Sequence, residues 1–113
     1  MKVKVNNKTY DLGEEYQALN SSNEYQRGKN RELVKIDFNG MTEEEVKKIG
    51  FVDGITWSII VKNENNEDTE FDMSTYSLVG NMLITYEGVV SLYMGKQTDT
   101  ELLESMVNDL LEA

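Results

Sequence analysis

The sequence contains no cysteine and no histidine, and these two absences remove side chains on which many enzymes depend. Without cysteine there is no disulfide, no thiolate nucleophile and no zinc–thiolate site. Without histidine, the usual base of a nucleophilic triad and the side chain that titrates near neutral pH are both missing. We therefore expect no catalytic residues, no metal site and no cofactor, and we predict that the chain is not an enzyme.

Proline and long hydrophobic runs are absent as well. The lack of proline leaves the registers of any hairpins to turn residues and to packing. Met1 is followed by Lys-Val-Lys-Val and then by polar residues, which is not the apolar core of a signal peptide. No segment is long and apolar enough to span a bilayer. The sequence therefore predicts no secretion by a signal peptide and no membrane partner.

Positive charge is scarce and is unevenly distributed. The chain has 11 Lys and Arg against 21 Asp and Glu, which gives a net charge of −10. Residues 1–35 carry seven basic and five acidic side chains, whereas residues 36–113 carry four and sixteen. A chain this acidic repels nucleic acid, so we expect no direct nucleic-acid binding. A basic first third beside an acidic remainder suits head-to-tail or ring assembly of identical copies.

The 113 residues fit a single domain, residues 1–113. Most of its elements are predicted as strands because apolar and polar residues alternate. These segments are a hairpin at 3–12, strands at 33–38 and 55–61, an interrupted strand at 71–78 and a hairpin at 82–94. Residues 13–32 lack the alternation and are predicted to form a loop with at most one helical turn, around 14–19.

Two helices are predicted from capping signals. Thr42 and Glu45 form a capping box that begins a short middle helix, which ends near Gly50. Thr98 and Glu101 form a second capping box before a helix at 99–111. Its apolar residues recur at helical spacing: Leu102, Leu103, Met106, Val107, Leu110 and Leu111. We expect this stripe to be buried on the sheet of the same chain, with burial against another subunit as the alternative.

The predicted fold class is α+β. We expect a mainly antiparallel sheet of about five to seven strands, a short middle helix and a C-terminal amphipathic helix packed on the sheet.

The candidate partner-binding residues lie in the expected loop, because long loops inside compact domains are usually functional or mobile. Its basic side chains form the only basic patch that the sequence suggests, and that patch could equally meet the acidic face of a neighbouring copy. The candidates are Tyr16, Tyr25, Arg27, Lys29 and Arg31.

Clusters of carboxylates have a structural interpretation that competes with a functional one. The acidic residues at 64–72 could bind a divalent cation, but the spacing and the turn glycine of an EF-hand are missing, which favours a solvated hairpin turn. A pair of carboxylates could also act as a hydrolase. With 21 Asp and Glu some pair will always look suitable, so we rank this hypothesis last.

Three parts of the chain resemble small phage and prophage proteins: residues 3–12, the segment 33–38 followed by the capped helix 41–49, and residues 86–94 before the leucine-rich helix. The resemblance implies a viral or prophage-encoded accessory or structural component, in the cytoplasm of the host or in the virion. Our first hypothesis is a non-enzymatic interaction or structural component, for instance of virion or tail assembly, whose partner is another protein or a second copy. The alternative is an acidic inhibitor that mimics nucleic acid and occupies a host DNA-binding enzyme.

Overall fold

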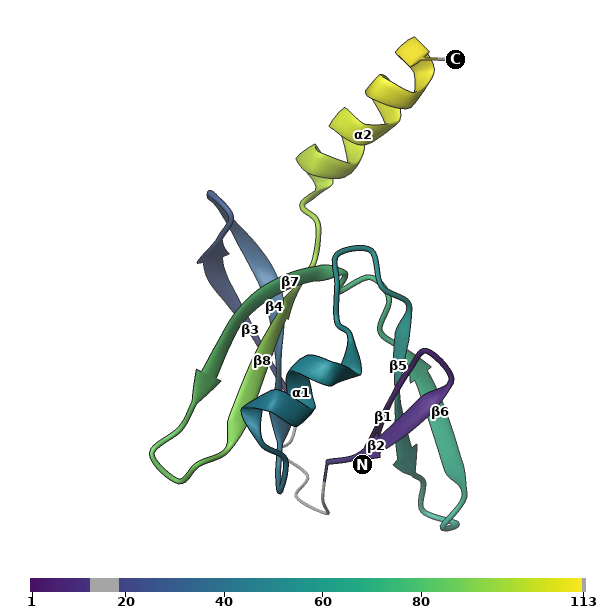
Figure 1. Ribbon diagram of the computed structural model, residues 1–113. Coiled ribbons are helices and arrows are strands. Elements are labelled where there is room, and N and C mark those ends of the chain that lie inside the picture. Colours follow the sequence, from purple (N-terminus) through teal and green to yellow (C-terminus); the bar gives the residue numbers. More distant parts are fainter. Residues whose placement is uncertain (13–18, 113) are drawn as a thin grey trace.

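The structure is a computed structural model that describes residues 1–12 and 19–112. Over these residues it is an α+β fold with two four-stranded antiparallel sheets and two helices, which confirms the predicted fold class. The eight strands form four consecutive hairpins, and the hairpins join the two sheets alternately. The predicted number of strands, five to seven, was therefore too small. Figure 1 shows the two sheets facing each other, with the C-terminal helix outside both.

The first sheet, sheet A, has the strand order β2-β1-β5-β6. Its central strands β1 and β5 pair with Val3 opposite Ile59 and Val5 opposite Trp57, so these side chains share one face. That face is the buried one, whereas Lys2 and Lys62 are exposed. The strands are β1 Lys2–Val5, β2 Lys8–Asp11, β5 Trp57–Lys62 and β6 Asp68–Asp72.

The second sheet, sheet B, has the strand order β3-β4-β8-β7. It corrects the prediction of a loop over residues 19–32, whereas residues 13–18, where a helical turn was predicted, lie outside the described residues. Residues 19–26 form a strand that pairs residue by residue with β4, although residues 20–24 are all polar. Residues 21–25 are exposed at the edge of the sheet, so no apolar alternation marks the strand in the sequence. The strands are β3 Leu19–Gln26, β4 Lys29–Phe38, β7 Leu78–Ile84 and β8 Val90–Gly95.

The core lies between the inner faces of the two sheets and is sealed on one side by α1, Glu43–Ile49. Figure 1 shows α1 in front of the gap between the sheets. The predicted capping box of Thr42 and Glu45 is present, and Gly50 ends the helix in the left-handed conformation. Val46 and Ile49 enter the core from this helix.

Three aromatic side chains pack against one another in the core. The ring of Phe51 makes edge contacts with Phe38 and Trp57, at centroid distances of 6.3 Å and 5.6 Å. Trp57 also donates its indole N–H to the carbonyl of Tyr76, which satisfies its only polar atom. The core residues of sheet A and sheet B therefore meet around the one tryptophan.

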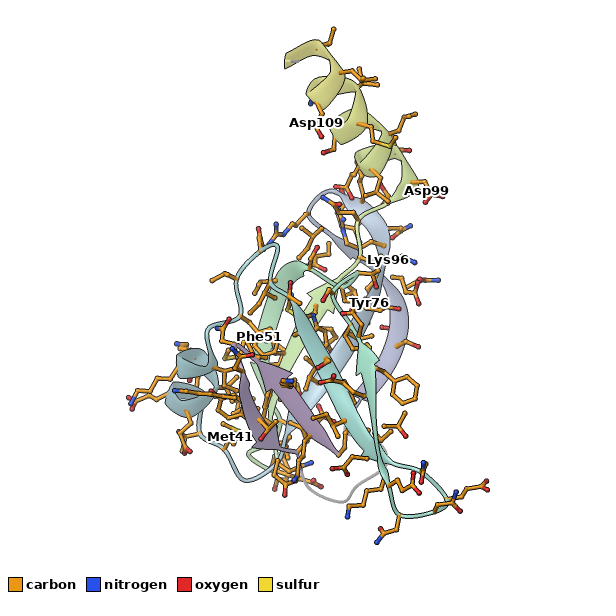
Figure 2. The ribbon with its side chains drawn as sticks, turned by 90° about the vertical axis from the view of Figure 1, so that its right-hand side faces the viewer. Met41, Phe51, Tyr76, Lys96, Asp99 and Asp109 are labelled. Carbon is orange, nitrogen blue, oxygen red and sulfur yellow. The ribbon has the colours of Figure 1, made fainter. Side chains whose placement is uncertain are left out.

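The C-terminal helix α2, Asp99–Glu112, does not pack on the sheet, which corrects the position we expected for it. Its predicted start at the Thr98–Glu101 capping box is confirmed. Figure 2 shows the helix extending from Asp99 to Asp109 away from both sheets, with no other element beside it. The apolar stripe is exposed as a result.

We predict that Phe38→Ala lowers the free energy of unfolding by about 3 to 5 kcal/mol, because it leaves a cavity beside Phe51 in a core that excludes water. Phe71→Ala is the matched control, since Phe71 is 53% exposed, and it should cost about 1 kcal/mol or less. Urea unfolding followed by the fluorescence of buried Trp57 measures both. Equal losses for the two variants would contradict the assignment of the core.

Candidate functional site

The candidate site is α2 together with the contacts that hold it, and it begins at Arg31 on β4. Strand alternation places Arg31 on the face of sheet B opposite the core, because Val34, Ile36 and Phe38 face inward. The Arg31 side chain is nevertheless completely buried. Gly95 on β8 leaves room for it, since a Cβ at that position would lie 3.0 Å from the Arg31 Cδ atom.

The buried guanidinium of Arg31 connects three parts of the chain. Its Nε donates to the carbonyl of Gln26 at 3.0 Å, and its Nη1 donates to the carbonyl of Lys96 at 3.2 Å. Its two Nη atoms donate to the two carboxylate oxygens of Glu101, at 2.5 Å and 3.0 Å. Bidentate pairs of this kind combine charge with fixed geometry. Arg31 thus joins the end of β3, the segment after β8 and the first turn of α2.

Glu101 has a second role in the same turn. Its carboxylate accepts the backbone N–H of Thr98, and the Thr98 hydroxyl accepts the N–H of Glu101, which completes the capping box. The hydrogen bonds from Arg31, followed by the one from Thr98, lower the pKa of Glu101 to about 2. The segment before the helix is held as well, because the Lys96 N–H donates to the Glu32 carbonyl. These contacts therefore fix the direction in which α2 extends from the two sheets, which with α1 form the body of the protein.

Beyond its base, α2 presents a broad apolar face to water. Helical spacing of 100° per residue spreads its six apolar side chains over about half of the circumference. Each of them is between 44% and 79% exposed, and exposure is greatest at the far end of the helix. The side chains are Leu102, Leu103, Met106, Val107, Leu110 and Leu111.

An exposed face of this size is unfavourable in water. Burying one large aliphatic side chain is worth about 1.5 to 3 kcal/mol, so six half-exposed ones leave on the order of 5 kcal/mol unrealised. Helices of about 14 residues are also marginal in water without tertiary packing. Contiguous apolar surface of this kind marks interaction sites in soluble proteins. The apolar face of α2 is therefore the candidate interaction surface of this structure.

The structure places the described candidate residues at the end of the hairpin of β3 and β4, but it exposes them unequally. Tyr25 is 74% exposed, Lys29 is half-buried, and Arg31 is buried against Glu101. Tyr16 lies outside the described residues. Arg31 consequently contributes nothing to an exposed basic patch, and we no longer assign it to a docking surface, whereas a binding role for Tyr25 and Lys29 stays a prediction.

Arg27, at the turn between β3 and β4, is also engaged within the chain. Its two Nη atoms each donate to Asp53 at 2.7 Å, and Nη2 also donates to the Val79 carbonyl. The hydrogen bonds from Arg27, with one from the Val79 N–H, lower the pKa of Asp53 to about 2. These hydrogen bonds connect the turn between β3 and β4 to β7, the strand at the opposite edge of sheet B. A binding role for Arg27 stays a prediction, and a partner would compete with Asp53 for its guanidinium.

An open hollow of about 500 Å³ lies on the outer face of sheet A and is lined mainly by polar residues, together with Trp57. Two of its charged groups are paired, because Glu70 lies 3.5 Å from the Lys4 ammonium and also accepts a hydrogen bond from Ser58 at 2.9 Å. Asp72 accepts hydrogen bonds from Ser74. These contacts give the three charged residues of the hollow a structural role at sheet A.

In the part of the chain that the structure describes, residues 1–12 and 19–112, no group of three or more histidine, cysteine, aspartate or glutamate side chains is placed to hold a metal ion. Neither of its helices combines the length and the apolar character that crossing a membrane requires.

We predict that Glu101→Ala lowers the free energy of unfolding by about 3 kcal/mol, because it leaves the buried Arg31 guanidinium without its carboxylate. Glu104→Ala is the matched control, since Glu104 is exposed on the same helix, and it should change stability by about 0.5 kcal/mol or less. Hydrogen exchange of the α2 amides should also accelerate in Glu101→Ala alone. If the two variants behave alike, Arg31 does not anchor the helix.

The lowered pKa of Glu101 predicts how stability depends on pH. A carboxylate whose folded pKa of about 2 lies below its ordinary value of 4.5 stabilises the fold fully above 4.5, and this contribution is lost as the pH falls toward 2. Glu101→Gln removes the titrating group, so its free energy of unfolding should fall less steeply than that of the wild type between pH 4.5 and pH 2. Urea titrations at several pH values measure the two slopes, and identical slopes would contradict the lowered pKa.

No protein-family model, no curated protein and no solved structure matches this chain. The resemblance to small phage and prophage proteins therefore stays a prediction.

Proposed function

We propose that this protein is a non-enzymatic interaction or structural component that attaches to another protein through α2. The observation that carries the proposal is the exposed apolar face of a helix whose base is anchored by an ion pair with buried Arg31. A helix that served only the fold would lay this face on a sheet. Here the capping box and Arg31 hold it away from both sheets, in the position of an arm.

The body supports the same function by acting as a rigid platform. Over the described residues, the two sheets and α1 enclose one core of fourteen buried apolar residues. Arg27, at the turn after edge strand β3, also donates a hydrogen bond to Val79 on the other edge strand of sheet B. A rigid platform with a protruding arm suits a component that joins other subunits in an assembly, such as a virion or tail, as the resemblance to phage proteins implies. In that setting the protein acts in the host cytoplasm or in the particle. The competing arrangement is self-association through α2, and sedimentation of the wild type over a range of concentrations tests it.

A second candidate function is the acidic mimic of nucleic acid, and the feature that favours it is the row of carboxylates on β6. Asp68, Glu70 and Asp72 are exposed and alternate along this edge strand, so they point to the same side. Glu70, however, lies 3.5 Å from the Lys4 ammonium, which interrupts the negative row. Mimicry predicts that DNA competes with this protein for a host enzyme, whereas attachment through α2 predicts no such competition.

We predict that Met106→Gln with Leu110→Gln abolishes binding to the protein that co-purifies with the wild type. Glutamine keeps helix propensity while it removes the apolar surface of two side chains that are 63% and 77% exposed. Phe71→Gln with Leu83→Gln is the control, since it removes two half-exposed apolar side chains from the body. Affinity purification with quantitative mass spectrometry compares the pairs, and circular dichroism checks that each variant keeps its helices. A partner that is retained by the α2 variant, or no stable partner for the wild type, would refute the proposal.

A further inference from the structure

The polar side of α2 carries charge of one sign only. The helix contains five acidic residues and no lysine or arginine. Glu101 is neutralised by Arg31 at the base, so the outer part of the helix keeps its negative charge without a basic side chain on the same element. An amphipathic helix that binds a partner lays its apolar face in a groove, and the charges beside that face complement charges at the rim of the groove.

The negative charges lie along both borders of the apolar face. Glu104 and Val107 line the same shallow hollow on one side of the helix. Helical spacing places Asp109 on the opposite border, beside Leu102 and Met106. Any surface that covers the apolar face therefore approaches a carboxylate on each side.

A second copy of this chain does not match these borders. Two α2 helices packed face to face, with their axes about 8 to 10 Å apart, would place carboxylates next to carboxylates along the borders of the contact, and like charges that face each other across an interface are unfavourable. The rest of each chain is also acidic, because α2 accounts for five of the ten net negative charges. Charge therefore opposes self-association through this helix.

Nucleic acid and membrane surfaces fit no better. Both nucleic acid and anionic bilayers repel an acidic helix, and helices that lie in a membrane interface typically carry lysine and arginine on the polar face, which α2 lacks. The width of the apolar face gives the remaining clue. A stripe over half of the circumference is wider than the narrow seam of a two-helix coiled coil and suits a groove that contacts the helix from several sides.

We propose that α2 docks by its apolar face in an apolar groove of a partner protein whose rim carries lysine and arginine. This inference rests on the proposed function and specifies the chemistry of the partner. The groove contacts the six apolar side chains, and its basic rim meets Glu104 and Asp109. Arg31 holds the helix away from the body so that the groove can close around it.

The test selects ligands from a displayed library of random peptides on the full-length protein, with counter-selection on the Met106→Gln/Leu110→Gln variant. A peptide in which apolar residues alternate with lysine or arginine reproduces one wall of the proposed groove. We expect the peptides that depend on α2 to be rich in both residue classes. Glu104→Lys with Asp109→Lys should weaken the binding of such a peptide about tenfold or more, as measured by calorimetry.

The control is Glu64→Lys with Glu67→Lys, which makes the same change of net charge at the exposed turn between β5 and β6 and should leave the affinity unchanged. The inference is overturned if α2-dependent peptides lack basic residues, if no peptide depends on α2, or if both charge reversals weaken binding equally. Sedimentation showing that the wild type dimerises through α2 would overturn it as well. The proposed function is judged separately by co-purification, so a partner of neutral or acidic character would refute this inference alone.

Discussion

The ion pair of buried Arg31 with half-buried Glu101 is the interaction on which the position of α2 depends. It costs the desolvation of Arg31 and part of the hydration of Glu101, and the fold offsets that cost through the carbonyls of Gln26 and Lys96 and the capping hydrogen bonds of Thr98. A hydrophobic contact in its place could let α2 settle against a sheet in many orientations. A bidentate ion pair fixes one orientation, because both partners have defined directions for their hydrogen bonds.

The elements with internal periodicity could be predicted from the sequence. The strand around Trp57, the two helices with their capping boxes, and the α+β fold class follow from alternation, from helical spacing and from local capping residues. The hairpin at 82–94 follows from two apolar runs around Glu87-Gly88. In each case the deciding contacts lie within a few residues, so the local sequence contains them.

Contacts between distant residues explain what the sequence did not reveal. Strand β3 exists because β4 offers its backbone groups, and an exposed edge strand needs no apolar pattern of its own. The position of α2 depends on one arginine 70 residues before its partner Glu101. An amphipathic stripe shows that a helix face must be covered, but it does not identify the covering surface. One feature of the sequence points to this contact. Arg31 and Leu33 lie on the same face of β4, so a charged side chain shares its surroundings with an apolar one.

The alternation of hairpins between the sheets has a consequence for how the chain reaches this fold. Sheet A becomes continuous only when β1 pairs with β5, and sheet B only when β4 pairs with β8, so each junction joins segments more than fifty residues apart. Closing such long loops before any reward is gained slows folding. During synthesis on a ribosome, neither sheet can form completely until the later strands have been made. The last strand of the core, β8, leaves the ribosome just before α2.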